Sequence, residues 1–267
     1  MFPASFRTCL LVAGISAAAI PLQACAKTDG NFSADQQKEI GAIAAKYLVD
    51  HPEVLQQASQ QLQQQQQDQA TSELRQNALQ QADALLNDSQ TPTYGPKNAK
   101  VAVVEFFDYQ CIYCAHTAPE LEKTMKAHPE ARYVFKEFPV FGQRWAASTQ
   151  AAIDGLTIYK EKGAKAYLNY HNGIFGTGKN EGSLKESDIS AIAAKSGISQ
   201  AQLKANSDSA KIWINNNMEL AQQLGVMGTP TLIVMPTQGA NADNTTAIPG
   251  AADQATLDKA IKKAAGN

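Results

Sequence analysis

The feature that most constrains the fold is an unbroken run of β-branched and aromatic residues, VAVVEFF, at residues 101–107. A second run of this kind, ARYVFKEFPV, follows at residues 131–140. Runs that lack polar alternation are typical of strands buried on both faces of a sheet. A stretch suited to a helix begins between them at Cys111. Together they predict a strand, a helix and a second strand, the start of an α/β domain.

The rest of the chain extends this α/β plan. Helical signals run from Gln143 to about Leu224, and TPTLIVM at residues 229–235 then has the composition of a strand. TTAIPG fits one more strand, and ADQATLDKAIKKAA fits a closing helix whose late lysines suit the negative end of the helix dipole. The sequence therefore predicts an α/β domain over residues 91–267 with a helical insertion at about 143–224.

The first 26 residues have the pattern of a secretory signal, with one cation, an apolar stretch and then small residues. The apolar stretch is too short to span a membrane. Its end fits cleavage after Ala26 and also fits a lipobox in which Cys25 is acylated, and both alternatives stay open. In either case Cys9 leaves with the signal and Cys25 is removed or blocked. The mature protein then keeps two thiols, in an oxidising compartment where disulfides persist.

Residues 27–90 are predicted to form a separate helical region. Ser33 opens a capping-box pattern, apolar residues follow at helical spacing, and Pro52 ends one helix and begins the next. The second helix crosses a glutamine-rich tract, Gln56 to Gln69, before an apolar stripe returns at Ala70, Leu74, Ala78, Ala82 and Leu85.

Two alternatives explain these helices. One is a solvated helix of low complexity. The other, which we favour, is that short amphipathic helices bury their apolar faces against another subunit, since they cannot bury them alone. The following segment, Asn87 to Asn98, is rich in turn formers and reads as a linker before the catalytic domain.

The charge of the chain excludes one class of partner. The formal net charge is -2 and the sequence contains no basic stretch that could bind polyanions. Binding to nucleic acid or to anionic lipid is therefore not indicated.

The chemistry of the chain centres on Cys111 and Cys114. In a helix that begins at Cys111, each residue turns by roughly 100°, so the second cysteine lies about 60° from the first on the same face. The two sulfurs can therefore form a bond. The unpaired N–H groups and the positive dipole end at the helix start favour a thiolate at Cys111. Cys111 is thus the predicted nucleophile, which must be accessible, and Cys114 the resolving thiol.

Three other uses of the two cysteines fit less well. Haem attachment needs a histidine where Ala115 stands. Zinc needs about four ligands, and the nearest candidate, His116, points to the other helix face. A purely structural disulfide would close too small a loop to constrain the unfolded chain much. We therefore predict no metal and no dissociable cofactor.

The strand, the C-x-x-C pair and the helix with Pro119 inside it resemble the thioredoxin fold. The later stretch GVMGTPTLIV resembles the loop of that fold whose proline is cis and lies against the cysteine pair, which maps onto Pro230 with Thr229 before it. A loop of this kind offers its backbone edge to an extended substrate peptide. Thr229 either tunes Cys111 through its hydroxyl or caps the loop.

The long helical insertion and the stretch EFFDYQC resemble the exported, periplasmic DsbA-like thiol:disulfide oxidoreductases, over Ala99 to the C-terminus. In that family an acidic residue is buried beneath the active site, and Glu105 matches it. The resemblance implies that Glu105 relays the proton that Cys114 must lose. The alternative is a structural ion pair between Glu105 and Lys136.

Two further resemblances concern assembly and specificity. The segment from Phe32 to Gln67 is similar to the helical N-terminal part of the suppressor-of-copper-sensitivity protein C group, whose members oligomerise through it. This implies a homo-oligomer, a dimer or a trimer. With Tyr113 before the second cysteine and Thr229 before the proline, the sequence resembles the dimeric isomerases of the DsbC type. We expect both residues to contact substrate.

The sequence thus predicts an exported thiol:disulfide interchange protein that forms and isomerises disulfides. Its expected partners are unfolded or misfolded exported proteins and a membrane redox protein that resets the cysteine pair. Ile112 and Tyr113 bring no cation to the cysteines, so we expect the pKa of Cys111 to lie below the ~8.5 of a free cysteine but above ~3.5. Two alternatives stay open, a Cu(I)-binding protein that uses the cysteines and Met227, and a plain monomeric dithiol oxidase.

Overall fold

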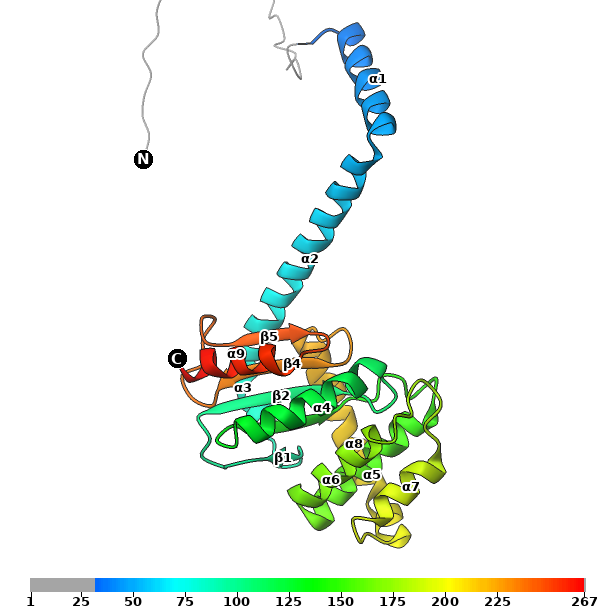
Figure 1. The fold of residues 1–267 in the computed structure, drawn as a ribbon, viewed down its shortest axis with the longest axis vertical. Coiled ribbons are helices and arrows are strands. Elements are labelled where there is room, and N and C mark those ends of the chain that lie inside the picture. Colours follow the sequence, from blue (N-terminus) through cyan, green and yellow to red (C-terminus); the bar gives the residue numbers. More distant parts are fainter. Residues whose placement is uncertain (1–31, 267) are drawn as a thin grey trace, which may run out of the picture. The chain divides into compact units, whose positions relative to one another are not determined.

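The computed structural model describes residues 32–266, which fall into two compact units (Figure 1). The smaller unit ends at Ser59 and the larger begins at Gln60. The predicted signal segment, with Cys9 and Cys25, lies outside the described residues. Within residues 32–266, no helix has the length and apolar character needed to cross a membrane.

The smaller unit contains helix α1, Ala34–Asp50, and the first turns of helix α2, Pro52–Gln80. The predicted capping box is present, because the Ser33 side chain accepts from the Gln36 N–H and the Gln36 side chain accepts from the Ser33 N–H. No residue of α1 is buried. Its apolar side chains, such as Ile40, Ile43 and Tyr47, are exposed to solvent.

The larger unit is built on a five-stranded sheet with the order β1-β3-β2-β4-β5. The strands are β1 Thr93–Tyr94, β2 Val101–Phe107, β3 Arg132–Glu137, β4 Thr231–Pro236 and β5 Thr246–Pro249. Strands β2 and β3 are parallel, and the other pairs are antiparallel. Every residue of β2 and of β4 is buried, as the lack of polar alternation predicts.

Helices cover both faces of this sheet (Figure 1). Helix α4, Ile112–Ala127, and helix α9, Gln254–Ala265, pack on one face, where Val103, Leu121 and Leu257 share one core cluster. The other face is covered by the end of α2, by α3, Ala82–Leu86, and by the last turns of α8, Gln200–Leu224, through residues such as Leu85 and Leu224. The site described below lies at the end of the α4 face.

The predicted insertion lies between β3 and β4 and consists of four helices. They are α5 Ala146–Lys162, α6 Ala164–Phe175, α7 Glu186–Ala194 and α8 Gln200–Leu224. Helices α5 and α8 share a small core of their own, built on Ala152, Ile153, Leu156, Ala210 and Ile214. The predicted element order and the α/β fold class are confirmed.

Two predictions about the start of the larger unit are wrong. The segment from Asn87 to Asn98 is not a linker, because it contains β1, which pairs with β3 at Thr93 and Val134. The stripe on α2 and α3 is not free to bury itself against another subunit, because Leu74 and Leu85 are 3% and 0% exposed in the core of this chain. The compact unit that holds the sheet starts at Gln60, so it includes part of α2 ahead of the predicted catalytic domain at residues 91–267.

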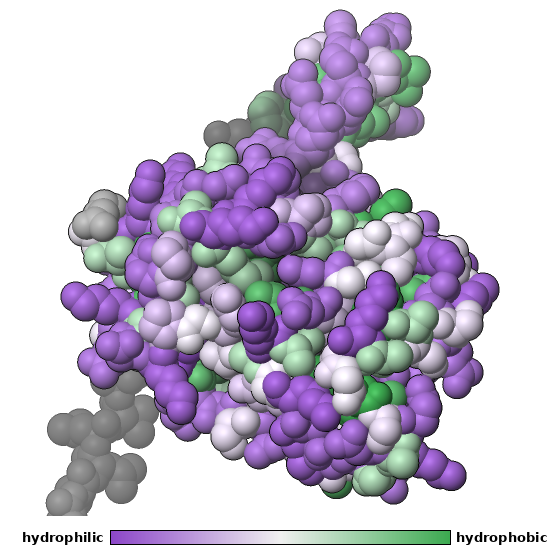
Figure 2. Space-filling model, turned by 60° about the horizontal axis from the view of Figure 1, so that its bottom comes forward, coloured by the Kyte–Doolittle hydropathy of each residue, from purple (hydrophilic) through white to green (hydrophobic). Residues whose placement is uncertain are grey.

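One face of the larger unit is predominantly hydrophilic, and hydrophobic residues appear on it only as small, separate patches (Figure 2). Among the described residues, half of the large exposed hydrophobic side chains belong to α1 and α2, namely Ile40, Ile43, Tyr47, Val49, Leu55 and Leu62. Two others lie near the cysteine pair: Tyr113 stands between the two cysteines in the sequence, and Met227 lies two residues before Thr229, whose carbonyl contacts Cys111.

Candidate active site

Cys111 is the N-cap of helix α4. Its backbone is extended, with φ -82° and ψ 121°, and its carbonyl accepts the first helical hydrogen bond, from the Ala115 N–H at 3.0 Å. Its own N–H donates to the Asp108 carbonyl at 3.0 Å, which closes the turn between β2 and α4. Cys114 follows in the first turn of the helix, and both cysteines are free thiols. Strand β2 and the turn after it thus place the Cys111 sulfur at the start of α4.

The two thiols differ in acidity because of their surroundings. The hydrogen bond with the Cys114 side chain lowers the pKa of Cys111 from its ordinary value of 9.0 to about 6, although burial opposes this shift. Hydrogen bonds from the Thr229 side chain and from the N–H groups of Cys114 and Tyr113 add to the lowering. The pKa therefore lies within the predicted range, and near neutral pH Cys111 is largely a thiolate, the reactive form.

Burial has the opposite effect on Cys114. It is 0% exposed, and desolvation raises the pKa of its thiol well above 9.0. The hydrogen bond to Cys111 and the charges of Cys111 and Glu105 raise the pKa further. Cys114 therefore holds its proton until another group accepts it, which suits a thiol that acts second.

The exposure of the nucleophile differs from the expectation. The sequence predicts an accessible Cys111, but only 3% of its surface is exposed. The cause is the Thr229–Pro230 loop, which lies against the helix start, so that the Cys111 Sγ donates to the Thr229 carbonyl at 3.2 Å. Tyr113, in the first turn of α4, is 60% exposed.

The loop between α8 and β4 has the geometry that the resemblance implies. The Thr229–Pro230 peptide bond is cis. Thr231 Oγ1 donates to the Gly228 carbonyl at 2.8 Å, so the loop is capped by Thr231 and not by Thr229. The Thr229 hydroxyl is buried and has no hydrogen-bond partner while Cys111 is a thiol. It can donate to the thiolate, which is how it lowers the pKa of Cys111.

Glu105 lies on the face of β2 that looks toward α4. It is 1% exposed, and neither of its carboxyl oxygens has a hydrogen-bond partner. Desolvation, followed by the negative charge of Cys111, raises its pKa from 4.5 to about 8. A buried carboxyl group whose pKa lies near neutral pH can exchange a proton with a neighbouring thiol.

The alternative role for Glu105, an ion pair with Lys136, is wrong. In the parallel register Glu105 lies opposite Phe135, and Phe106 lies opposite Lys136, so the two side chains point to opposite faces of the sheet. Lys136 is instead held by the Ala84 carbonyl at 3.0 Å, Thr91 Oγ1 at 2.8 Å and Asp88. Within residues 32–266, Glu105 thus has no cationic partner.

Two buried carboxyl groups near the cysteines were not predicted. The first, Asp108, accepts from the Gln110 N–H at 2.8 Å, the Phe141 N–H at 2.9 Å and Ser148 Oγ at 2.7 Å. It therefore ties the turn before Cys111 to the start of the insertion. Its place two residues before Gln110 is the pattern of an Asx turn, which the sequence could have indicated.

The second unpredicted group is Glu137 at the end of β3. Its Oε1 accepts from the Tyr109 hydroxyl at 3.0 Å and from the Tyr167 hydroxyl at 2.9 Å, whereas its Oε2 has no partner. Burial raises its pKa well above 4.5, and the charges of Asp108 and Glu105 add to this. Glu137 lies in a stretch with the apolar residues YVF before Lys136 and FPVF after Glu137, and a carboxyl group in such surroundings is the signal that could have revealed it.

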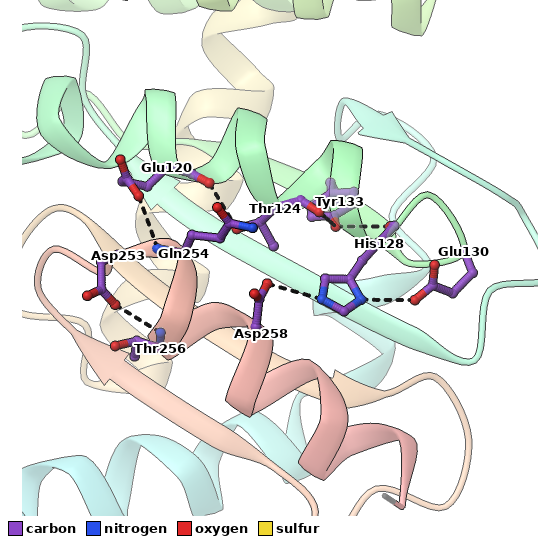
Figure 3. A network of polar contacts seen from close by, with 9 residues as sticks. All are labelled: Glu120, Thr124, His128, Glu130, Tyr133, Asp253, Gln254, Thr256 and Asp258. Atoms are coloured by element: carbon purple, nitrogen blue, oxygen red, sulfur yellow. Dashed lines mark hydrogen bonds and ion pairs between the residues drawn. The ribbon is translucent and has the colours of Figure 1, made fainter.

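Helix α4 is held in place by a polar network with α9 (Figure 3). A carboxylate oxygen of Glu120 accepts from the Gln254 N–H at 3.2 Å. At the other end of α4, the ring of His128 lies 3.1 Å from Asp258 and 3.1 Å from Glu130. The helix that carries the cysteines is therefore fixed at its far end, and its start is fixed by Asp108.

No group of three or more histidine, cysteine or acidic side chains within residues 32–266 is arranged to hold a metal ion. The site consists of two thiols of unequal acidity, a cis-proline loop against the first and a buried acid beside the second. These features define a thiol–disulfide oxidoreductase with a thioredoxin fold.

Comparison with known families agrees with this class. The Thioredoxin family model matches residues 87–262, and the model of the copper resistance protein ScsC N-terminal domain matches residues 36–69. The chain belongs to the thioredoxin family, with an N-terminal region of the ScsC kind. This bears out the resemblance to the thioredoxin fold and that of the N-terminal segment to the suppressor-of-copper-sensitivity protein C group.

Solved structures give the same result. BcfH of Salmonella enterica Typhimurium is 39% identical, with 86% of this chain and 96% of that chain covered and a TM-score of 0.74. ScsC of Proteus mirabilis in a transitional conformation is 30% identical, with 88% and 100% covered and a TM-score of 0.60. The thiol-disulfide exchange protein alpha-DsbA2 of Wolbachia pipientis is 26% identical, with 71% and 95% covered and a TM-score of 0.60.

The curated relatives are much longer proteins. The Na(+)/H(+) antiporter NhaA 1 of Salinispora arenicola is 24% identical over 52% of this chain, but the match spans only 21% of that protein. The antiporter NhaA 3 of Salinispora tropica is 31% identical over 22% of this chain and 10% of its own length. The likeness therefore concerns a minor part of those proteins.

Proposed function

We propose that this protein is an exported disulfide isomerase that acts in the periplasm on unfolded or misfolded proteins, and that it works as a homo-oligomer. The observation that carries the proposal is the unequal pair at the start of α4, a thiol with a pKa of about 6 beside one with a pKa well above 9. A thiolate with a pKa close to ambient pH is both ionised and still nucleophilic. The signal pattern at the N-terminus supports export.

The reaction begins with the Cys111 thiolate. It attacks one sulfur of a substrate disulfide, forms a mixed disulfide with it, and releases the other substrate sulfur as a thiolate. In isomerisation a different substrate thiolate then attacks the substrate sulfur of the mixed disulfide. This forms the new substrate disulfide and releases Cys111 as a thiolate, so that no net oxidation occurs.

Cys114 provides the alternative exit from the mixed disulfide. It loses a proton and attacks Cys111, which gives the Cys111–Cys114 disulfide and leaves the substrate reduced. Formation of the mixed disulfide removes the negative charge of Cys111, one of the two causes that raise the pKa of Glu105. Glu105 therefore becomes more ionised at this stage and can accept the proton of Cys114. A membrane redox partner would reset the pair.

The N-terminal helix supports the oligomeric part of the proposal. The stripe of Ile40, Ile43 and Tyr47 is 47%, 62% and 53% exposed, which is unfavourable for an isolated amphipathic helix. Pairing of such helices would join two or more catalytic units around one substrate and raise the effective concentration of thiolate at its disulfides.

Substitutions on α1 test the oligomeric isomerase. Ile43→Glu with Tyr47→Glu puts two charges on the apolar stripe, and Ala42→Glu with Ala45→Glu puts two on the opposite, exposed side as a matched control. We expect light scattering to find an oligomer for the wild type and the control, and a single chain for the stripe variant. The stripe variant should lose refolding of scrambled ribonuclease but still oxidise dithiol peptides.

Two results would count against the proposal. A monomeric wild type with ordinary refolding activity would remove the role of α1. Cu(I) binding that outcompetes a thiol chelator, together with negligible ribonuclease refolding, would favour the copper-binding alternative.

A further inference from the structure

A groove of about 280 Å³ lies beside the cis-proline loop, on the side away from α4. Its floor and one wall come from the loop and from the end of β5, and its other wall comes from the middle of α2. The lining side chains of α2 are Gln67, Ala70 and Leu74. Helix α2 therefore does more than precede the catalytic unit, because it completes a cavity next to the reactive sulfur.

The side chains around this groove are uncharged. They include Met227, Pro230 and Pro249, together with glycines at positions 225, 228 and 250. A Cβ added at Gly228 would meet nothing within 4 Å, so the loop leaves the groove open here. Met227 is 92% exposed and has a flexible side chain that adapts to different apolar partners. The groove therefore suits an apolar side chain of moderate size.

The alternation of an extended chain determines which substrate residue reaches the groove. Leu232 and Val234 of β4 point to the α4 face, whereas Thr231 lines the groove and Ile233 points to the α2 face. A peptide that adds as a strand beside the loop alternates in the same way. Its reacting cysteine must point to the α4 side, where Cys111 is held against the Thr229 carbonyl. The residues directly before and after that cysteine then point to the α2 side.

We propose that this groove is a specificity subsite for an apolar side chain directly adjacent to the substrate cysteine, with Ala70 of α2 at its wall. The inference rests on the disulfide exchange proposed above and adds a rule for substrate choice. Cysteines flanked by apolar residues are buried in native proteins and exposed in misfolded ones. The subsite would therefore favour cysteines that have not reached their native surroundings.

Two short peptides test the subsite. Each carries one cysteine as a thiopyridyl disulfide, and they differ only in the neighbouring residue, Leu or Asp. The full chain with Cys114→Ala forms the mixed disulfide, and absorbance follows the thiopyridone that is released. We expect the Leu peptide to react about tenfold faster than the Asp peptide, the effect of partial burial of one leucine side chain.

Variants of the exposed Ala70 locate the effect. Ala70→Trp fills the groove and should bring the Leu-to-Asp ratio close to one, whereas Ala70→Lys should reverse it in favour of Asp. Gln65→Trp adds the same ring to the opposite side of α2, outside the groove lining, and should keep the tenfold ratio.

The outcomes separate this subsite from the proposed function. Equal rates for both peptides in the wild-type groove, or an unchanged ratio in both Ala70 variants, overturn the subsite. If the unsubstituted site also fails to react with oxidised glutathione, Cys111 is not a working nucleophile, and the proposed function fails together with the subsite.

Discussion

Replacing Glu105 with glutamine should make the stability of the reduced protein much less dependent on pH. Glu105 is 1% exposed and both of its carboxyl oxygens lack partners, so ionisation in the folded state is costly. Its pKa is about 8 in the folded protein against an ordinary 4.5, so between these values the folded protein holds a proton that the unfolded chain has lost. Stability therefore falls as pH rises through this window.

The size of the effect follows from this shift. Each pH unit inside the window costs about 1.4 kcal/mol, so the change from about pH 5 to about pH 7.5 costs about 3 kcal/mol. Glutamine has almost the same shape and no charge to lose, so the variant lacks this dependence. It keeps a polar group without a partner, and that cost is the same at both pH values.

Urea unfolding of the reduced wild type and of Glu105→Gln at these two pH values measures the difference. The wild type should lose about 3 kcal/mol more than the variant on going to the higher pH. Other buried acids, such as Glu137, titrate in both proteins and cancel in the comparison. Parallel pH profiles for the two proteins would refute the assignment of a raised pKa to Glu105.

The remaining predictions concern the cysteine pair and the seam between α4 and α9. Alkylation of Cys111 should have a midpoint near pH 6, and Thr229→Val should move it upward because the thiolate loses a hydrogen-bond donor; an unchanged midpoint would contradict this role of the hydroxyl. Cys114→Ala should accumulate the mixed disulfide with substrate, visible as a mass increase, because the resolving thiol is absent. His128→Ala should lower the free energy of unfolding by about 1 kcal/mol through loss of the contacts to Asp258 and Glu130; Lys126→Ala, which removes only an exposed ion pair, should cost less in the same urea titration.

The parts of the fold that could be predicted from the sequence are those set by local composition. The apolar run at residues 101–107 forms the fully buried strand β2. The run at residues 229–235 forms the fully buried strand β4 from Thr231 onward, and its first two residues belong to the loop before β4. The spacing of Cys111 and Cys114 together with the helix start was enough to anticipate their unequal acidity. Local composition determined the two strands and the helix start, whereas burial in the folded chain supplies the raised pKa of Cys114.

What could not be predicted depends on pairing between distant segments. Strand β1 has only two residues in a stretch of turn formers, and it forms because the edge of β3 offers partners. The partner of Lys136 depended on which face of the sheet each side chain takes, and this is fixed by the register of β2 and β3. The burial of Leu74 in the same chain also depends on the packing of α2, which the helical pattern alone does not specify.

The three hydrogen bonds of Asp108 have a consequence for engineering this protein. The same carboxylate holds the turn in front of Cys111 and two groups at the entrance to the four-helix insertion. Trimming the insertion to obtain a minimal oxidoreductase would therefore remove two of the hydrogen bonds that hold the turn before Cys111. A miniaturised version would need a replacement for Phe141 and Ser148 before its first cysteine could be expected to keep its acidity.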